Sequence, residues 1–156
     1  MAEPIALALR IEPATSPAAT ALFGGLNAEI VQRYPDASPT GMDVAAFVAA
    51  GGVMAIGYVG DAPVCCGGFR PHARDTVEIK RMYVAPAWRR RGFSRRLLAF
   101  IEAEAARRGF ARAVLETGTR QPEAIALYAS CGWQQIPPYG PYADDPLTVC
   151  FAKQLS

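Results

Sequence analysis

Residues 76–98 read TVEIKRMYVAPAWRRRGFSRRLL, and this stretch decides the fold. Residues 76–84 are rich in β-branched and aromatic side chains and are followed by Pro86, which predicts a strand that ends before the proline. Residues 92–108 predict an amphipathic helix that Gly109 ends. The apolar stripe of that helix consists of Leu97, Leu98, Ile101 and Ala105. The stretch therefore indicates a strand that leads through a short basic turn into a helix.

The predicted strand has side chains suited to both of its faces. Alternation along a regular strand divides them into two sets: Val77, Ile79, Arg81 and Tyr83 on one face, and Glu78, Lys80, Met82 and Val84 on the other. We therefore expect a central strand that is covered on both sides.

Shorter patterns on both sides of this stretch predict the remaining elements. Further strands are expected at 5–11, 53–59, 64–69, 113–116, 133–136 and 147–152, and further helices at 18–34, 42–50 and 124–130. Hairpin strands come first, and alternating strands and helices follow. We expect an α+β, α/β-like fold with a central mixed, partly parallel, twisted sheet of about six or seven strands flanked by about four helices.

The composition fits a single domain over residues 1–156. Hydrophobic residues make up 51% of the chain, enough for a buried core, and the net charge of +2 is too small to indicate a nucleic-acid binder. The four cysteines lack CxxC or zinc spacing, so we expect free thiols, no metal and a cytoplasmic protein. We expect no signal peptide and no membrane span, because the longest uncharged run, 44–60, is shorter than ~20 residues.

The basic turn is the segment that indicates chemistry. Five arginines lie close together around a glycine and the predicted helix start: Arg89, Arg90, Arg91, Arg95 and Arg96. Unpaired backbone N–H groups and the helix dipole favour phosphate at such a position, and Gly92 permits close approach of a ligand. A diphosphate fits this turn. A solvated basic turn that starts a surface helix fits the same residues, and the turn alone leaves both interpretations open.

Three motifs together resemble the GNAT superfamily of N-acetyltransferases. Residues 89–94, RRRGFS, are similar to its acyl-CoA-binding motif [Q/R]xxGx[G/A], with Ser94 in place of the usual Gly or Ala. Residues 78–84 resemble the family's fourth strand. Residues 121–128, QPEAIALY, with Gly132 and Trp133, resemble its N-x-x-A-x-x-L-Y…G-F element. The similarity covers roughly residues 53–155 and implies the GNAT fold and transfer of an acetyl group from acetyl-CoA to a primary amine of a small molecule or peptide.

The resemblance also implies a donor site and catalytic residues. The residues expected to contact acetyl-CoA are Met82, Tyr83, Val84, Arg89, Arg90, Arg91, Gly92, Phe93, Ser94, Arg95 and Gln121. Glu78 is expected to act as the base, with a water relay as the alternative, and Tyr128 as the acid that faces the CoA sulfur. An N–H around Met82 or Tyr83 would stabilise the oxyanion at a bulge that the sequence alone does not show.

The acceptor side is less well specified. By resemblance, Tyr34, Arg70, Tyr139 and Tyr142 border it, and aromatic walls with an arginine would suit a small substrate that bears a carboxylate. A non-catalytic acyl-CoA-binding sensor is the alternative function. A nucleic-acid-binding helix is disfavoured, because the apolar stripe of the helix predicted at 92–108 would pack into the core. By resemblance, the family also includes homodimers, so a homodimer is a possible partner state.

Overall fold

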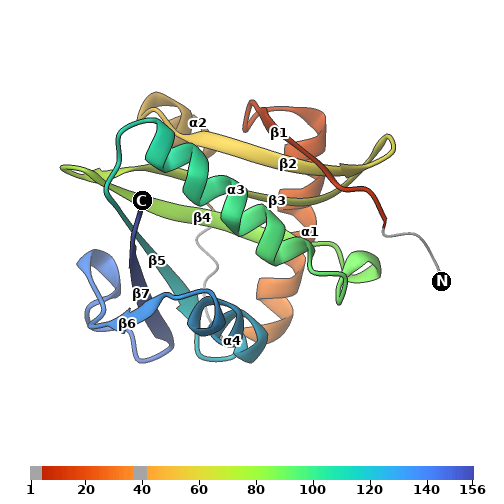
Figure 1. Cartoon of the computed structure of the whole chain (residues 1–156). Helices are drawn as coiled ribbons and strands as arrows, with labels where there is room; N and C mark the ends of the chain where they lie inside the picture. The colour runs from red at the N-terminus through yellow and green to blue at the C-terminus, as the bar shows by residue number, and fades with distance from the viewer. Residues whose placement is uncertain (1–4, 37–41) are drawn as a thin grey trace.

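The computed structural model describes residues 5–36 and 42–156, whose strands and helices are shown in Figure 1. In chain order the elements are β1 (Ala8–Glu12), α1 (Pro17–Arg33), α2 (Val44–Ala49), β2 (Val53–Val59), β3 (Ala62–Ala73), β4 (Thr76–Val84), α3 (Phe93–Arg107), β5 (Arg112–Gly118), α4 (Pro122–Ser130), β6 (Gln134–Ile136) and β7 (Thr148–Gln154). Short 3-10 helices at Pro86–Trp88 and Gly140–Tyr142 precede α3 and β7. The predicted strand–turn–helix run is confirmed.

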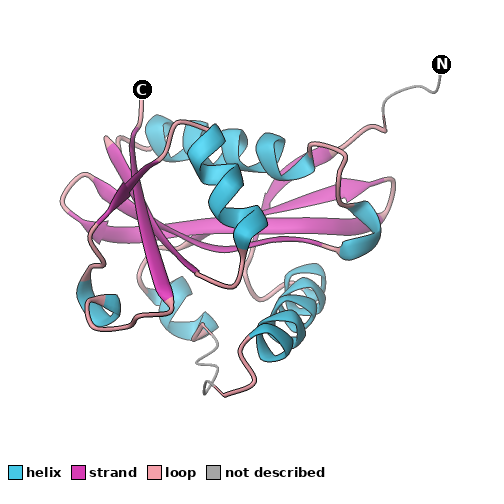
Figure 2. Cartoon of the chain, turned by 90° about the horizontal axis from the view of Figure 1, so that it is seen from below, coloured by secondary structure: helices cyan, strands magenta, loops and turns pink. Residues whose placement is uncertain are grey.

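The strands form one mixed sheet. Its order is β1-β2-β3-β4-β5-β7-β6, with β4 and β5 parallel and the other neighbours antiparallel. Figure 2 shows helices on both faces of this sheet. The fold is thus the expected α+β architecture with a partly parallel central sheet.

Buried side chains form a separate cluster on each face of the sheet. One cluster is built around Leu97, Leu98 and Ile101 of α3, and the other around Phe23 of α1 and Phe47 of α2. The sheet is therefore covered on both sides, which explains why β2 reads as a nearly continuous apolar run.

Local sequence signals account for most element boundaries. The side chain of Ser16 accepts a hydrogen bond from the N–H of Ala19 at 3.1 Å, and Pro17 occupies the first turn of α1, as its sequence predicts. The strand β3 runs to Ala73, longer than predicted from its glycines. It pairs with β2 on one side and β4 on the other, so tertiary pairing overrides the weak local propensity.

A β-bulge interrupts β4 at Arg81. Lys80 is paired with Gly68, and Tyr83 with Cys66, so two residues of β4 face the single residue Gly67. Arg81 has a φ of 62°, in the left-handed region that few non-glycine residues occupy. The extra residue reverses the alternation of side chains in the second half of β4.

This reversal corrects the expected assignment of faces. Ile79 packs in the α3-side cluster, as do Met82 and Val84 beyond the bulge, whereas Tyr83 packs in the α1-side cluster. The prediction that Ile79, Arg81 and Tyr83 share one face is therefore wrong. Regular alternation holds only up to Lys80, because a bulged strand changes register by one residue.

The two central parallel strands separate soon after they pair. Pairing between β4 and β5 covers only Thr76 to Glu78 against Arg112 to Val114. Beyond Glu78, β4 stays paired with β3, and β5 stays paired with β7 as far as Gly118. The sheet therefore opens into a fork between 79–84 and 115–118.

The four cysteines are unbridged, and burial makes two of their thiols harder to ionise. Cys65, Cys66, Cys131 and Cys150 are unbridged, and burial raises the pKa of Cys65 to about 11 and that of Cys66 to about 12. Among the described residues, no helix is both long and apolar enough to span a bilayer.

The side chains of the α3-side cluster should contribute strongly to stability. Leu97→Ala removes a fully buried side chain and is expected to lower the free energy of unfolding by about 2–5 kcal/mol. Val31→Ala, at a position of α1 that is 47% exposed, is the matched control and should change it by less than about 0.5 kcal/mol. Urea titration followed by far-UV circular dichroism measures both, and equal losses would contradict the described packing.

Candidate active site

Two cavities adjoin at the fork between β4 and β5. The first, here called the strand cavity, has a volume of about 490 Å³ and is lined chiefly by residues 79–82, 115–118 and the facing side of α1. The second, here called the turn cavity, has a volume of about 550 Å³ and is lined by the basic turn before α3 together with Met82, Tyr83 and Val84. The lining residues common to both cavities are Leu26, Met82, Gln121, Ala124 and Tyr128. The opening of the sheet thus creates two cavities that adjoin each other.

The start of α3 presents unused backbone donors to the turn cavity. Gly92 occupies the N-cap position with a φ of 77°, no side chain caps the helix, and its first turn holds no acidic residue. From Arg90 to Arg95, no backbone N–H donates a hydrogen bond to a described residue. Free N–H groups at the positive end of a helix dipole make this a site for an anion.

Several arginines of the turn are held by the protein itself. The Arg89 guanidinium lies 2.8 Å from a carboxylate oxygen of Glu29 and donates from Nε to the carbonyl oxygen of Val84 at 2.8 Å. Arg95 donates to the Ser130 hydroxyl at 2.6 Å. Arg89 and Arg95 still line the turn cavity, but their side chains also tie the turn to neighbouring elements.

The other three arginines of the cluster, Arg90, Arg91 and Arg96, point to different surroundings. Arg90 lines the turn cavity and has a φ of 64°. Arg91 lies over the Trp88 ring, 5.4 Å from its centroid, and is not part of the cavity lining. Arg96 donates to the carbonyl oxygen of Leu7 at 3.2 Å. The cluster therefore does not converge on one ligand, because most of its members pack against neighbouring elements.

Tyr128 lies where the two cavities join. Its side chain is almost completely buried, and this burial raises the pKa of the phenol, so the hydroxyl stays protonated at neutral pH. Gln121, also at the junction, accepts a hydrogen bond from the N–H of Gly118 at 3.2 Å. Phe93 and Ser94 also line the turn cavity.

Glu78 lies behind the strand cavity and does not line it. Its side chain is 2% exposed, and Arg70 donates to its Oε1 from Nε at 3.1 Å and from Nη2 at 2.9 Å. The Tyr139 hydroxyl donates to Oε2 at 2.6 Å, and burial together with this bond raises the pKa of Tyr139. Both carboxylate oxygens are thus occupied by protein donors.

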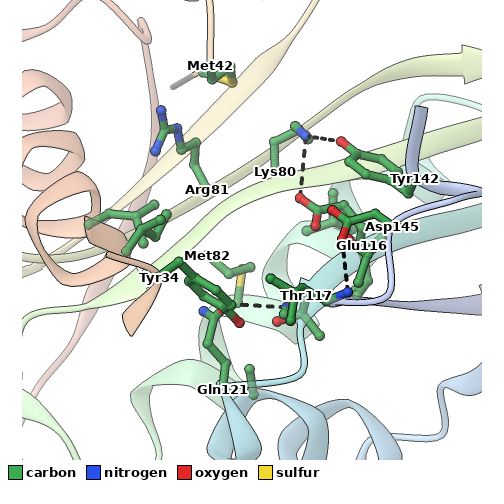
Figure 3. Close-up of a pocket in the computed structure, with 18 of the residues that line it drawn as sticks. Tyr34, Met42, Lys80, Arg81, Met82, Glu116, Thr117, Gln121, Tyr142 and Asp145 are labelled. Carbon is green, nitrogen blue, oxygen red and sulfur yellow. Dashed lines mark hydrogen bonds and ion pairs between the residues drawn. The ribbon is translucent and has the colours of Figure 1, made fainter. Parts of the chain in front are cut away.

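Lys80 connects this buried carboxylate to a second one, Glu116. The Lys80 Nζ is 3.9 Å from Oε1 of Glu78. It is also 3.9 Å from Oε1 of Glu116 and donates to the Tyr142 hydroxyl at 3.2 Å (Figure 3). Glu116 lines the strand cavity. Desolvation raises its pKa, more than Lys80 lowers it, and Glu78 and Asp145 raise it further.

Sequence reasoning missed Glu116 and Arg81 as members of the site. Glu116 is a lone acidic residue in an apolar strand, and Arg81 was expected on the face of Val77 and Ile79. Of the predicted acceptor-side residues, Tyr34, Arg70 and Tyr142 line the strand cavity, whereas Tyr139 packs behind Tyr142 with ring centroids 5.5 Å apart. Within the described residues, no three side chains of metal-ligating types gather into a metal site.

Comparison with known proteins identifies the fold family. A family model described as the acetyltransferase (GNAT) family matches residues 26–133, which include the basic turn and both arms of the fork. The chain belongs to the GNAT acetyltransferase family.

Similar proteins come from several bacteria. This GNAT chain is 45% identical over 78 residues to an IAA acetyltransferase of Azospirillum brasilense, covering 50% of the chain and 51% of that protein. It is 35% identical over 100 residues to the uncharacterized N-acetyltransferase YsnE of Bacillus subtilis, covering 63% and 66%. The matched region thus spans between half and two-thirds of these curated relatives.

Solved structures share the whole GNAT architecture. A Klebsiella pneumoniae protein named for acyl-CoA N-acyltransferase activity superposes with a TM-score of 0.81 at 29% identity, over 96% of this chain and 98% of its own. A GNAT family acetyltransferase from Elizabethkingia anophelis, solved with acetyl-CoA bound, superposes with a TM-score of 0.74 at 16% identity, over 96% and 98%.

The two carboxylates should respond differently to substitution. Glu116→Gln is expected to raise the free energy of unfolding at neutral pH, because the folded state disfavours the charged form of Glu116. The folded-state pKa is raised above the ordinary 4.5, so the wild type loses stability as pH rises from 4.5 through that pKa, and the variant does not. The gain should therefore be absent below pH 4.5 and grow above it in urea titrations at a series of pH values.

Glu78→Gln is the matched control for that experiment. It leaves Arg70 without its carboxylate partner and is expected to cost about 1–3 kcal/mol at neutral pH. A Glu116→Gln effect that is independent of pH, or one that matches the loss in Glu78→Gln, would contradict the desolvated setting described for the half-buried Glu116.

Proposed function

We propose that this GNAT chain transfers an acetyl group from acetyl-CoA to a primary amine by direct attack in a ternary complex. The observation that carries the proposal is the uncapped start of α3 opening into a cavity that adjoins a second cavity through the β4–β5 fork. One cavity offers donors for a diphosphate, and the other is lined by titratable side chains suited to an amine. The family match and the acetyl-CoA held by a protein of the same fold support the choice of donor.

The turn would bind the diphosphate chiefly through its main chain. The free N–H groups of residues 90–95 and the side chain of Arg90 are available to phosphate oxygens, whereas Arg89 and Arg95 shape the turn from either side. Arg91, which lies over Trp88, would contribute its backbone N–H alone.

The pantetheine arm would follow the free edge of β4. Beyond Glu78 this edge has no pairing with β5, so an extended chain can add along Met82, Tyr83 and Val84 as an extra strand does. Gln121 lies at the same junction. The thioester would then reach the point where the two cavities adjoin, beside the bulge whose N–H groups are proposed to stabilise the oxyanion.

Acetyl transfer needs one proton removed and one supplied. The amine nitrogen attacks the thioester carbon, the C–S bond breaks, and the sulfur leaves as a thiolate. Tyr128 is the proposed acid, because its hydroxyl-bearing side chain lies at the junction of the two cavities, where the sulfur would leave. Tyr128 would donate its proton, or a hydrogen bond, to the departing sulfur.

The amine proton has two proposed acceptors. Glu116 is our first choice, because it lines the strand cavity and its raised pKa makes it a better base than an ordinary carboxylate. Glu78, the sequence-based choice, is held by Arg70 and Tyr139 and would act through Lys80 or water.

The buried free thiols fit a reducing compartment, and we propose a cytoplasmic location.

Gly92→Val tests the phosphate-binding turn. It places a β-branched side chain at a φ of 77° and beside the free N–H groups, and is expected to raise the dissociation constant for CoA about tenfold or more. Gly60→Val is the matched control, since Gly60 also has a positive φ, 58°, with no atom within 4 Å of an added Cβ, but lies in the β2–β3 turn.

Both glycine variants should lose similar stability, about 1–2 kcal/mol, whereas only Gly92→Val should lose CoA affinity in calorimetry. Unchanged CoA affinity in Gly92→Val would count against the proposed donor site. CoA binding by the wild type without acetyl transfer to any of a broad panel of amines would favour the sensor function instead.

The pH dependence of turnover separates the two candidate bases. If Glu116 takes the amine proton, kcat/KM should fall as pH decreases through its raised pKa, and Glu116→Gln should abolish this acid limb. Glu78→Gln should lower the rate but keep the limb. The opposite pattern would assign the base to Glu78. Tyr128→Phe should lower kcat with little change in CoA affinity, which checks the proposed acid.

A further inference from the structure

We propose that the strand cavity is built for an amine acceptor that also bears a carboxylate, and that Arg81 binds this carboxylate. The proposal deepens the proposed acetyl transfer, on which it rests, by naming the class of acceptor as small amino acids. Arg70, the arginine expected from the sequence to fill this role, is already paired with Glu78.

Arg81 is a cation whose hydrogen bonds within the described residues are incomplete. Its Nη1 donates to Oδ1 of Asn27 at 2.6 Å, and its guanidinium lies over the Phe23 ring, 5.4 Å from the centroid. Its Nε is buried and has no hydrogen-bond partner among the described residues. Nη2 makes no bond to a described residue and is not among the fully buried atoms, so it remains open to a ligand.

The other cations of the strand cavity are already neutralised. Arg70 lies 2.9 Å from Glu78, and Lys80 lies 3.9 Å from both Glu78 and Glu116. Across residues 5–36 and 42–156, Arg81 makes no ion pair, and burial lowers its pKa. A partly buried guanidinium without a counterion is costly, and a bound carboxylate would supply the missing charge and acceptors.

The opposite end of the cavity suits the amine. Figure 3 shows Arg81 on the α1 side, with Glu116 and Asp145 gathered near Lys80 and Tyr142 on the other side. Lys80 offsets one of these two carboxylates, so Asp145 leaves a negative charge in excess there. An amino acid would thus lie with its carboxylate at Arg81 and its nitrogen toward Glu116.

The position of Arg81 also fits the geometry of transfer. Arg81 directly precedes Met82, which borders both cavities at the proposed thioester position. Arg81 and Met82 both line the strand cavity, so a carboxylate held at Arg81 would share a cavity with the proposed thioester position. The bulge turns Arg81 toward α1, away from the α3-side core where Met82 packs.

Binding of product analogues tests the proposal without requiring turnover. Calorimetry in the presence of CoA would compare N-acetyl amino acids with their carboxamides, over side chains from glycine to phenylalanine. The acids should bind at least about tenfold more tightly than the amides, as expected for a charge-assisted pair. Arg81→Gln should abolish this preference, and Arg81→Lys should retain part of it.

Lys80→Gln is the matched control, because it removes a neighbouring cation that already has carboxylate partners. The acid preference should survive in it, and the CoA affinity of the Arg81 variants should match that of the wild type. Equal binding of acids and amides, no binding of either, or a preference that persists in Arg81→Gln or disappears in Lys80→Gln would overturn the proposal. An acid preference without any acetyl transfer would instead refute the proposed reaction and leave the Arg81 site standing.

Discussion

The separation of β4 from β5 beyond Glu78 is the constraint on which the site depends. Two parallel strands that stayed paired would fill the centre of the sheet with hydrogen bonds and leave no free edge. Pairing of β3 with β4, and of β7 with β5, holds each arm of the fork in place without closing it. The opening is thus maintained by ordinary sheet hydrogen bonds on its outer sides, so that both cavities lie on a rigid frame.

Most charged side chains near the two cavities are bound to other groups of the protein and hold the cavity walls in place. Arg89 and Arg95 connect the basic turn to α1 and α4. The unused N–H groups at the start of α3 are the donors left for an anionic ligand. Behind the strand cavity, Glu78 holds Arg70 and Tyr139, and Lys80 lies near Glu116 on the cavity wall. Much of the formal charge near the site is therefore already compensated, and the uncompensated groups stand out as sites for ligands.

Local signals in the sequence were enough to predict the elements and the basic turn. The strand at 76–84 and the helix at Phe93–Arg107 follow from β-branched runs, a proline stop and an apolar stripe, all of which act over neighbouring residues. The bulge at Arg81 could not be read in this way, because it depends on how Gly67 of another strand pairs with β4. The burial of Glu78 and the placement of Glu116 likewise depend on contacts among β3, β4, β5 and the loop before β7.

The Arg81 bulge also limits how the length of this segment can change. Deleting one residue between Lys80 and Tyr83 would restore regular pairing with β3 and rotate one half of β4 relative to the other. Either the apolar side chains of Met82 and Val84 would leave the α3-side core, or those of Val77 and Ile79 would. A deletion of one residue in a surface loop is usually tolerated. Here it would move the side chains of one half of β4 to the opposite face of the sheet. The number of residues in this part of β4 is therefore fixed by the two cores that the strand separates.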